Sequence, residues 1–164
     1  MKNMFYIFLV LLFCPAAALT CDFEKDFLGK TYDLLNSRFE INHELHKGKY
    51  FSQIIRNKNL KCKDLPEGEA TMFFIDEKLA RINIFSTSEK LDLLVFAKSK
   101  FGETENQLNE DSSNNKNYAD YWDKKNIIIT YKNTLSPQNI WQENLVIELK
   151  KFSSELYESE NVKE

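Results

Sequence analysis

The stretch from Ala70 to Ser86, ATMFFIDEKLARINIFS, contains two runs rich in Ile and Phe separated by charged residues. This pattern predicts an antiparallel β-hairpin. A turn centred on Glu77 and Lys78 would place three pairs on one largely apolar face: Ile75 with Ala80, Phe73 with Ile82, and Thr71 with Ile84. The other face would be mixed, with Phe74 opposite Arg81 and Met72 opposite Asn83. The hairpin is therefore expected to cover a core with one face.

Residues 87–101, which follow the hairpin, predict a helix. Ser86 and Glu89 have the spacing of a capping box, which satisfies the first N–H groups of a helix. An apolar stripe with helical periodicity follows, formed by Leu91, Leu94, Ala97 and Phe101. Gly102 is expected to end the helix, because glycine adopts the positive φ that a C-terminal cap requires.

The rest of the chain adds one more helix and several strands. Leu28, Tyr32, Leu35 and Phe39 form a helical stripe that predicts a helix over about 30–40, whereas 49–55 fits either a helix or a strand. A second hairpin and a further strand are predicted at 118–122, 127–131 and 144–149. This order indicates an α+β fold, with an antiparallel sheet of about five or more strands and one or two helices packed on one face.

The first residues have the layout of a secretory signal peptide. Lys2 precedes an apolar run of ten residues, and Pro15 and three alanines follow, so cleavage is expected after Ala18. The run is shorter than the about 20 residues of a spanning helix, so no stable membrane span is expected after cleavage. A lipid anchor at Cys21 is disfavoured, because Thr20 occupies the position where lipoproteins carry a smaller residue. The protein is therefore expected to be periplasmic or extracellular.

Cleavage at this point would leave Cys21 and Cys62 as the two cysteines of the mature chain. In an exported protein, two cysteines predict a disulfide. Residues 19–153 are expected to form a single globular domain, with a flexible polar loop at 103–117 and a polar C-terminal tail at 154–164. The net charge of −3, with both signs interspersed, does not favour nucleic-acid binding.

Few residues suggest catalysis or metal binding. His43 and His46 are the only histidines, and they lie three apart, whereas the zinc-protease motif needs a spacing of four. They remain the metal-binding candidates, although we expect no metal because the chain has no third histidine and no spare pair of cysteines to complete a tetrahedral site. The sequence has no Gly-x-Ser-x-Gly nucleophile motif and only four glycines, so we assign neither catalytic residues nor a cofactor.

Three aromatic residues are candidates for partner contacts: Tyr121, Trp122 and Trp141. Exposed aromatic side chains anchor partners, but next to an Ile-rich strand they also form core. We expect an exported protein that binds another protein or an envelope component, as an inhibitor, immunity or accessory factor would, rather than an enzyme. Two alternatives stay open, a secreted hydrolase that uses carboxylates and a carrier of a small apolar ligand.

Overall fold

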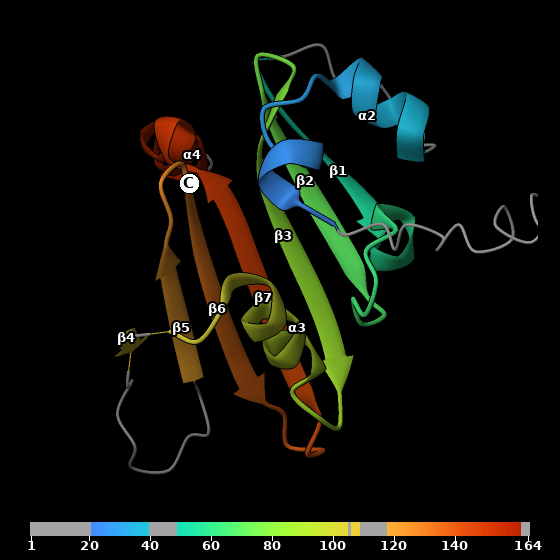
Figure 1. The fold of residues 1–164 in the computed structure, drawn as a ribbon, viewed down its shortest axis with the longest axis vertical. Coiled ribbons are helices and arrows are strands. Elements are labelled where there is room, and N and C mark those ends of the chain that lie inside the picture. Colours follow the sequence, from blue (N-terminus) through green and yellow to red (C-terminus); the bar gives the residue numbers. More distant parts are fainter. Residues whose placement is uncertain (1–20, 40–48, 105, 109–117, 162–164) are drawn as a thin grey trace, which may run out of the picture.

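The computed structural model describes residues 21–39, 49–104, 106–108 and 118–161. Seven strands form one antiparallel sheet with the order β1-β2-β3-β7-β6-β5-β4 (Figure 1). The strands are β1 (Tyr50–Arg56), β2 (Glu69–Ile75), β3 (Lys78–Ser88), β4 (Asn106–Leu108), β5 (Tyr118–Asp123), β6 (Ile127–Leu135) and β7 (Trp141–Leu149). The helical segments are η2 (Phe23–Phe27), α2 (Tyr32–Phe39), η3 (Asn57–Leu60), α3 (Asp92–Phe101), η4 (Lys150–Phe152) and α4 (Ser153–Asn161). The predicted α+β class is confirmed.

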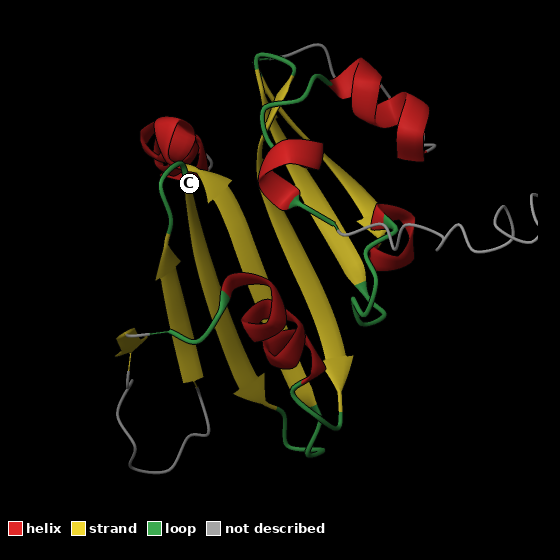
Figure 2. Cartoon of the chain, viewed as in Figure 1, coloured by secondary structure: helices red, strands yellow, loops and turns green. Residues whose placement is uncertain are grey.

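One face of the sheet forms the main core. The strand pairings align a row of buried side chains across five strands: Met72, Ile82, Ile147, Ile129 and Trp122. Segments η2, α2 and α3 contribute further buried residues to the same cluster (Figure 2). The Phe23 ring of η2 lies 6.3 Å from the Phe96 ring of α3. Every second side chain of these strands points to this face, and the three helical segments cover it, so its apolar side chains are shielded from water.

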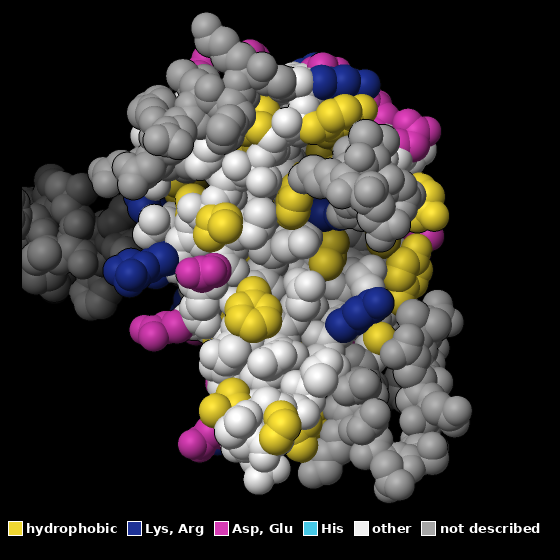
Figure 3. Space-filling view, turned by 180° about the vertical axis from the view of Figure 1, so that it is seen from behind, with side chains coloured by type: hydrophobic (Ala, Val, Ile, Leu, Met, Phe, Trp, Pro, Cys, Tyr) yellow, Lys and Arg dark blue, Asp and Glu magenta, His cyan; other side chains and the backbone are white. Residues whose placement is uncertain are grey.

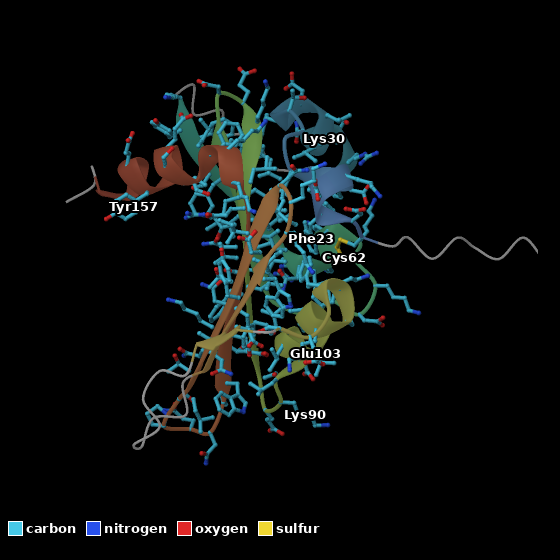
Figure 4. The ribbon with its side chains drawn as sticks, turned by 60° about the vertical axis from the view of Figure 1, so that its left-hand side comes forward. Phe23, Lys30, Cys62, Lys90, Glu103 and Tyr157 are labelled. Carbon is cyan, nitrogen blue, oxygen red and sulfur yellow. A yellow bond between two sulfur atoms is a disulfide. The ribbon has the colours of Figure 1, made fainter. Side chains whose placement is uncertain are left out.

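The C-terminal segment is a helix that packs on the opposite face of the sheet. Leu156 of α4 is 3% exposed and forms a small cluster with Ile75 and Ala80. Figure 4 shows α4 on one side of the sheet and η2, α2 and α3 on the other. Within the predicted polar tail, Ser153–Asn161 form a nine-residue helix, because Leu156 supplies an apolar contact with the sheet.

The first hairpin exists, but the predicted register is wrong. The turn consists of Asp76 and Glu77, whose φ angles of 46° and 63° are both positive. A two-residue turn of this kind matches the twist of the flanking strands. The pairing is Ile75 with Lys78, Phe74 with Leu79, Phe73 with Arg81, Met72 with Ile82 and Thr71 with Asn83, with a bulge between Phe73 and Phe74. As a result, Ala70, Met72 and Phe74 face the main core, and Thr71, Phe73 and Ile75 face the other side.

The helix after this hairpin begins later than predicted. Strand β3 continues to Ser88, and α3 begins at Asp92 without a side-chain cap from its N-cap residue, Leu91. The predicted capping box of Ser86 and Glu89 is therefore wrong. The end agrees with the prediction, because Gly102 has a φ of 88° and donates its N–H to Lys98 O.

The remaining elements follow the sequence pattern. The ambiguous segment 49–55 is strand β1, and the second hairpin and the last strand are β5, β6 and β7. Cys21 and Cys62 form the predicted disulfide, with their Cα atoms 4.9 Å apart. The predicted loop at 103–117 lies partly outside the described residues, and 106–108 within it pair with β5 as strand β4.

Candidate binding groove

An open groove of about 680 Å³ lies between the loop 61–68 and helix α3, over the end of β3. One wall is the loop, with Asp64, Pro66 and Glu67, and the opposite wall is α3, with Asp92, Val95, Phe96 and Ser99. The floor consists of Ser86, Thr87 and Ser88. In Figure 1 the loop and α3 flank the C-terminal half of β3.

The loop wall is attached to the sheet by buried polar groups. Asn57, which is 0% exposed, donates its side-chain N–H groups to Pro66 O at 3.0 Å and to Phe85 O at 3.2 Å. The hydroxyl of Ser86 donates to Glu67 O at 2.9 Å. Because buried polar groups are costly to leave unpaired, these bonds hold the loop in one position.

The disulfide reinforces the same loop. Cys62 is the second residue of the loop, and its bond to Cys21 ties the loop to the N-terminal segment (Figure 4). Lys61 and Asp64, on either side of this cysteine, have positive φ angles of 53° and 63°. Residues other than glycine adopt this conformation at a cost of about 1 kcal/mol or more, so surrounding contacts must stabilise it.

Glu143 of β7 fixes the α3 wall. This carboxylate is 0% exposed and accepts the N–H groups of Leu93 at 3.2 Å and Leu94 at 3.0 Å. A helix leaves its first N–H groups without partners, and its N-terminus is positive, so a carboxylate here satisfies both requirements. Glu143 thus caps the N-terminus of α3, the role that the sequence pattern predicts for Ser86 and Glu89.

Tyr131 holds the Glu143 carboxylate, and Asn133 in turn holds Tyr131. The Tyr131 hydroxyl donates to Glu143 Oε1 at 2.8 Å, and Asn133 Nδ2 donates to the Tyr131 oxygen at 3.2 Å. Burial, together with the hydrogen bond to Glu143, raises the pKa of Tyr131 far above its ordinary value. The phenol therefore stays protonated, and it keeps donating to the carboxylate.

The groove carries negative charge and one exposed apolar side chain. Asp64, Glu67 and Asp92 are all exposed, and within the described residues none of these carboxylates forms an ion pair. The lining includes no Lys, Arg or His. Val95, on the α3 wall, is an apolar side chain that is 67% exposed. A ligand in the groove could therefore contact both charged carboxylates and the apolar side chain of Val95.

The aromatic residues singled out from the sequence do not line this groove. Trp122 is 3% exposed and donates its indole N–H to Gly102 O at 2.8 Å, so it holds the end of α3 to the sheet. Tyr121 and Trp141 are half-buried. His43 lies outside the described residues, as does His46, and among the residues described no three metal-ligating side chains are grouped to hold an ion.

Sequence reasoning missed the groove, although one signal of it is present. On β7, Glu143 occupies the same face as Leu145, Ile147 and Leu149, so a carboxylate falls within an apolar stripe. Such a buried position requires partners, and the sequence alone does not reveal that these are the N–H groups of a helix about 50 residues away.

In comparisons with known proteins, no family model, curated protein or solved structure matches the chain. Function is therefore inferred from the geometry of the groove. Among the described helices, none combines the length and the apolar character that a membrane span requires.

Proposed function

We propose that the protein is an exported binding protein and that the groove between the loop 61–68 and α3 receives its partner, a protein or an envelope component. The observation that carries the proposal is that both walls are held in place by buried polar groups, Asn57 and Ser86 on one side and Glu143 on the other. A surface that is ordered before binding loses less conformational entropy when a partner docks. A rigid groove of this kind suits recognition.

Export is supported by two independent features. The first 18 residues have the layout of a signal peptide, and the Cys21–Cys62 disulfide is of a type that persists in the periplasm or outside the cell. Mass spectrometry of the protein recovered from its native compartment should find Leu19 at the N-terminus. An acylated Cys21 would contradict the proposed cleavage site.

The two alternative functions have less support. In a hydrolase that uses carboxylates, the buried acids Glu143 and Asp120, both 0% exposed, could not contact a substrate, so this role would fall to exposed acids such as those of the groove, whose lining holds no His, Lys or Arg to assist them.

A carrier of an apolar ligand needs an enclosed cavity, whereas the Phe side chains pack on one another and the pocket of about 300 Å³ beside Phe27 and Phe39 is partly open and also lined by the charged residues Asp26, Arg38 and Lys61. The ring centroids of Phe51 and Phe74 are 4.7 Å apart, and those of Phe27 and Phe39 are 5.2 Å apart.

Affinity capture with a matched pair of variants tests the proposal. Val95 in the groove and Ile54 on the opposite side of the molecule are 67% and 66% exposed, so Val95→Glu and Ile54→Glu make the same change on two surfaces. The mature protein is immobilised and exposed to the native envelope fraction. We expect Val95→Glu to reduce recovery of a stoichiometric partner by about tenfold, and Ile54→Glu to leave it unchanged. Equal recovery by the two variants, or no partner with the wild type, would overturn the proposal.

A further inference from the structure

We propose that two copies of the protein associate through strand β1, which lies at one edge of the sheet (Figure 1), so that their two sheets join into one. The inference goes beyond the proposed function, because no residue of β1 lines the groove. β1 pairs with β2 on one side, and among the described residues no strand lies on its other side.

The open side of β1 carries backbone groups without partners. At the start of the strand, Lys49 O accepts the N–H of Asp76 at 3.0 Å, and at its end the N–H of Asn57 donates to an oxygen across the ladder, Gly68 O, at 2.9 Å. In the regular ladder between these two bonds, every second residue directs its N–H and C=O groups away from β2. These residues are Tyr50, Ser52, Ile54 and Arg56. Within the described part of the chain nothing bonds to these outward groups, so they form a template for another strand.

β1 lacks the features that usually protect an edge strand. Protected edges are short, bulged, or rich in Lys and Pro. β1 has seven residues with neither Lys nor Pro, and its pairing with β2 has no bulge. Beside the open backbone groups, Ile54 is 66% exposed and Tyr50 is 43% exposed. Pairing with a second strand would therefore satisfy the backbone and cover apolar surface.

The side of β1 that faces the main core is complementary to itself in the antiparallel direction. With Gln53 of both copies at a twofold axis, Phe51 lies opposite Ile55 of the second copy. Ile55 belongs to the main core and Phe51 packs against it, so this pair continues the apolar core from one copy to the other. A shift of the register by two residues would instead place Gln53 opposite one of these apolar residues. The sequence of β1 therefore favours one register.

The other side of β1 fits the same register. Arg56, the one charged residue of β1, lies opposite Tyr50 of the second copy, whose ring is a suitable neighbour for a cation. Ser52 lies opposite Ile54 of the second copy. No two like charges face each other across the junction, and the outward backbone groups of the two copies are aligned to bond. A second copy of the chain thus matches the edge in charge and in hydrogen bonding.

Edge pairing fits this surface better than the stacking of two sheets. On the face opposite the main core, the apolar side chains in the part coloured in Figure 3 are separated by polar surface. At the other edge of the sheet, β4 comprises three residues, so β1 is the longer of the two edge strands described. Antiparallel pairing of β1 with itself uses the same surface on both copies, so the assembly closes at two.

Analytical ultracentrifugation of the mature protein over about 1–100 µM tests the association. We expect a monomer–dimer equilibrium, and a wild type that is monomeric at about 100 µM would overturn the inference. Ile54→Glu should weaken dimerisation at least about tenfold, whereas Val95→Glu, the same change in the groove at similar exposure, should dimerise like the wild type. Equal weakening by the two variants would contradict the inference. Because Ile54→Glu leaves the groove intact, failure of this inference and failure of the proposed function are observed separately.

Ser52→Pro tests the backbone pairing. Proline has no N–H, and at Ser52 this group points away from β2, so an edge strand tolerates the change. It removes a hydrogen bond at two symmetric positions of the junction, and we expect dimerisation at least about tenfold weaker. Ser52→Ala keeps the N–H and should dimerise like the wild type. Once urea denaturation has shown that Ser52→Pro is folded, undiminished dimerisation of this variant would overturn the inference.

A cysteine at the twofold axis tests the register. In the proposed pairing, Gln53 of the two copies face each other without hydrogen bonds between them, with Cα atoms about 4.5 Å apart. This separation permits a disulfide, so Gln53→Cys should form a cross-linked dimer on oxidation. Ser52→Cys is the control, because Ser52 lies opposite Ile54 and not opposite its own counterpart. Electrophoresis without reducing agent measures both, and equal cross-linking of the two variants would contradict the proposed pairing.

Discussion

Gly68 lies where the groove loop meets β3, and its backbone approaches the backbone of Phe85. Its φ angle is 150°, and a Cβ atom at this position would lie 2.0 Å from Phe85 O. The same carbonyl oxygen accepts a hydrogen bond from Asn57. A single residue without a side chain thus allows the loop to lie against the strand, and the position of the groove wall depends on it.

Gly68→Ala should therefore destabilise the protein strongly. The Cβ clash with a backbone oxygen forces the loop to move, and we expect the free energy of unfolding to fall by about 3 kcal/mol or more. Gly102→Ala is the control, because Gly102 also has a positive φ but has no atom within 4 Å of the added Cβ. It should cost less, about 1–2 kcal/mol, because only the strained backbone conformation opposes the change. Urea denaturation measures both values, and equal losses would contradict the close approach at Gly68.

At the scale of elements, α3 illustrates how one helix is placed by contacts at both ends. Glu143 accepts its first N–H groups, and Trp122 donates to Gly102 O just after its last turn. Both partners belong to the sheet, on β7 and β5. The helix is therefore positioned by the sheet rather than by residues adjacent to it in sequence.

Glu143→Ala should loosen this helix. The change leaves the N–H groups of Leu93 and Leu94 and the hydroxyl of Tyr131 without their acceptor, and we expect a loss of about 2–4 kcal/mol in the free energy of unfolding. Hydrogen exchange of the two amides should become faster. Gln142→Ala changes the exposed neighbour on the same strand and should cost less than about 0.5 kcal/mol. Unchanged protection of Leu93 and Leu94 in Glu143→Ala would show that the carboxylate does not hold the helix.

At the scale of the whole molecule, the disulfide connects segments that are far apart in sequence. Cys21 precedes η2, which packs on α3 through Phe23, and Cys62 lies near the start of the groove loop. The bond closes a loop across a separation of 41 residues. It therefore links the N-terminal part of the core directly to one wall of the groove.

Cys21→Ser/Cys62→Ser should lower the free energy of unfolding by about 3–4 kcal/mol, because the unfolded chain gains the freedom that the cross-link removes. Chemical denaturation of the variant and of the wild type, with and without a reducing agent, measures the effect. The reducing agent should destabilise the wild type and leave the variant unchanged. A wild type that is insensitive to reduction would contradict a stabilising role of the bond.

Much of the fold could be predicted from local patterns, but its details could not. The first hairpin is visible in the alternation of Ile and Phe, whereas its register depends on the turn at Asp76 and Glu77 and on a bulge, neither of which has a strong sequence signal. The end of α3 follows from Gly102, a local feature. Its beginning depends on Glu143, which lies about 50 residues further along the chain.

The sequence by itself determined the α+β class, the hairpins and the pairing of the two cysteines predicted for the mature chain, because these depend on short-range periodicity and on the small number of cysteines. Only the tertiary structure decided the groove. Its walls meet because Asn57 reaches Phe85, 28 residues away, and Glu143 reaches Leu93, 50 residues away. Hydrogen bonds over such separations form only once the sheet has assembled, so no single stretch of the sequence predicts the groove that depends on them.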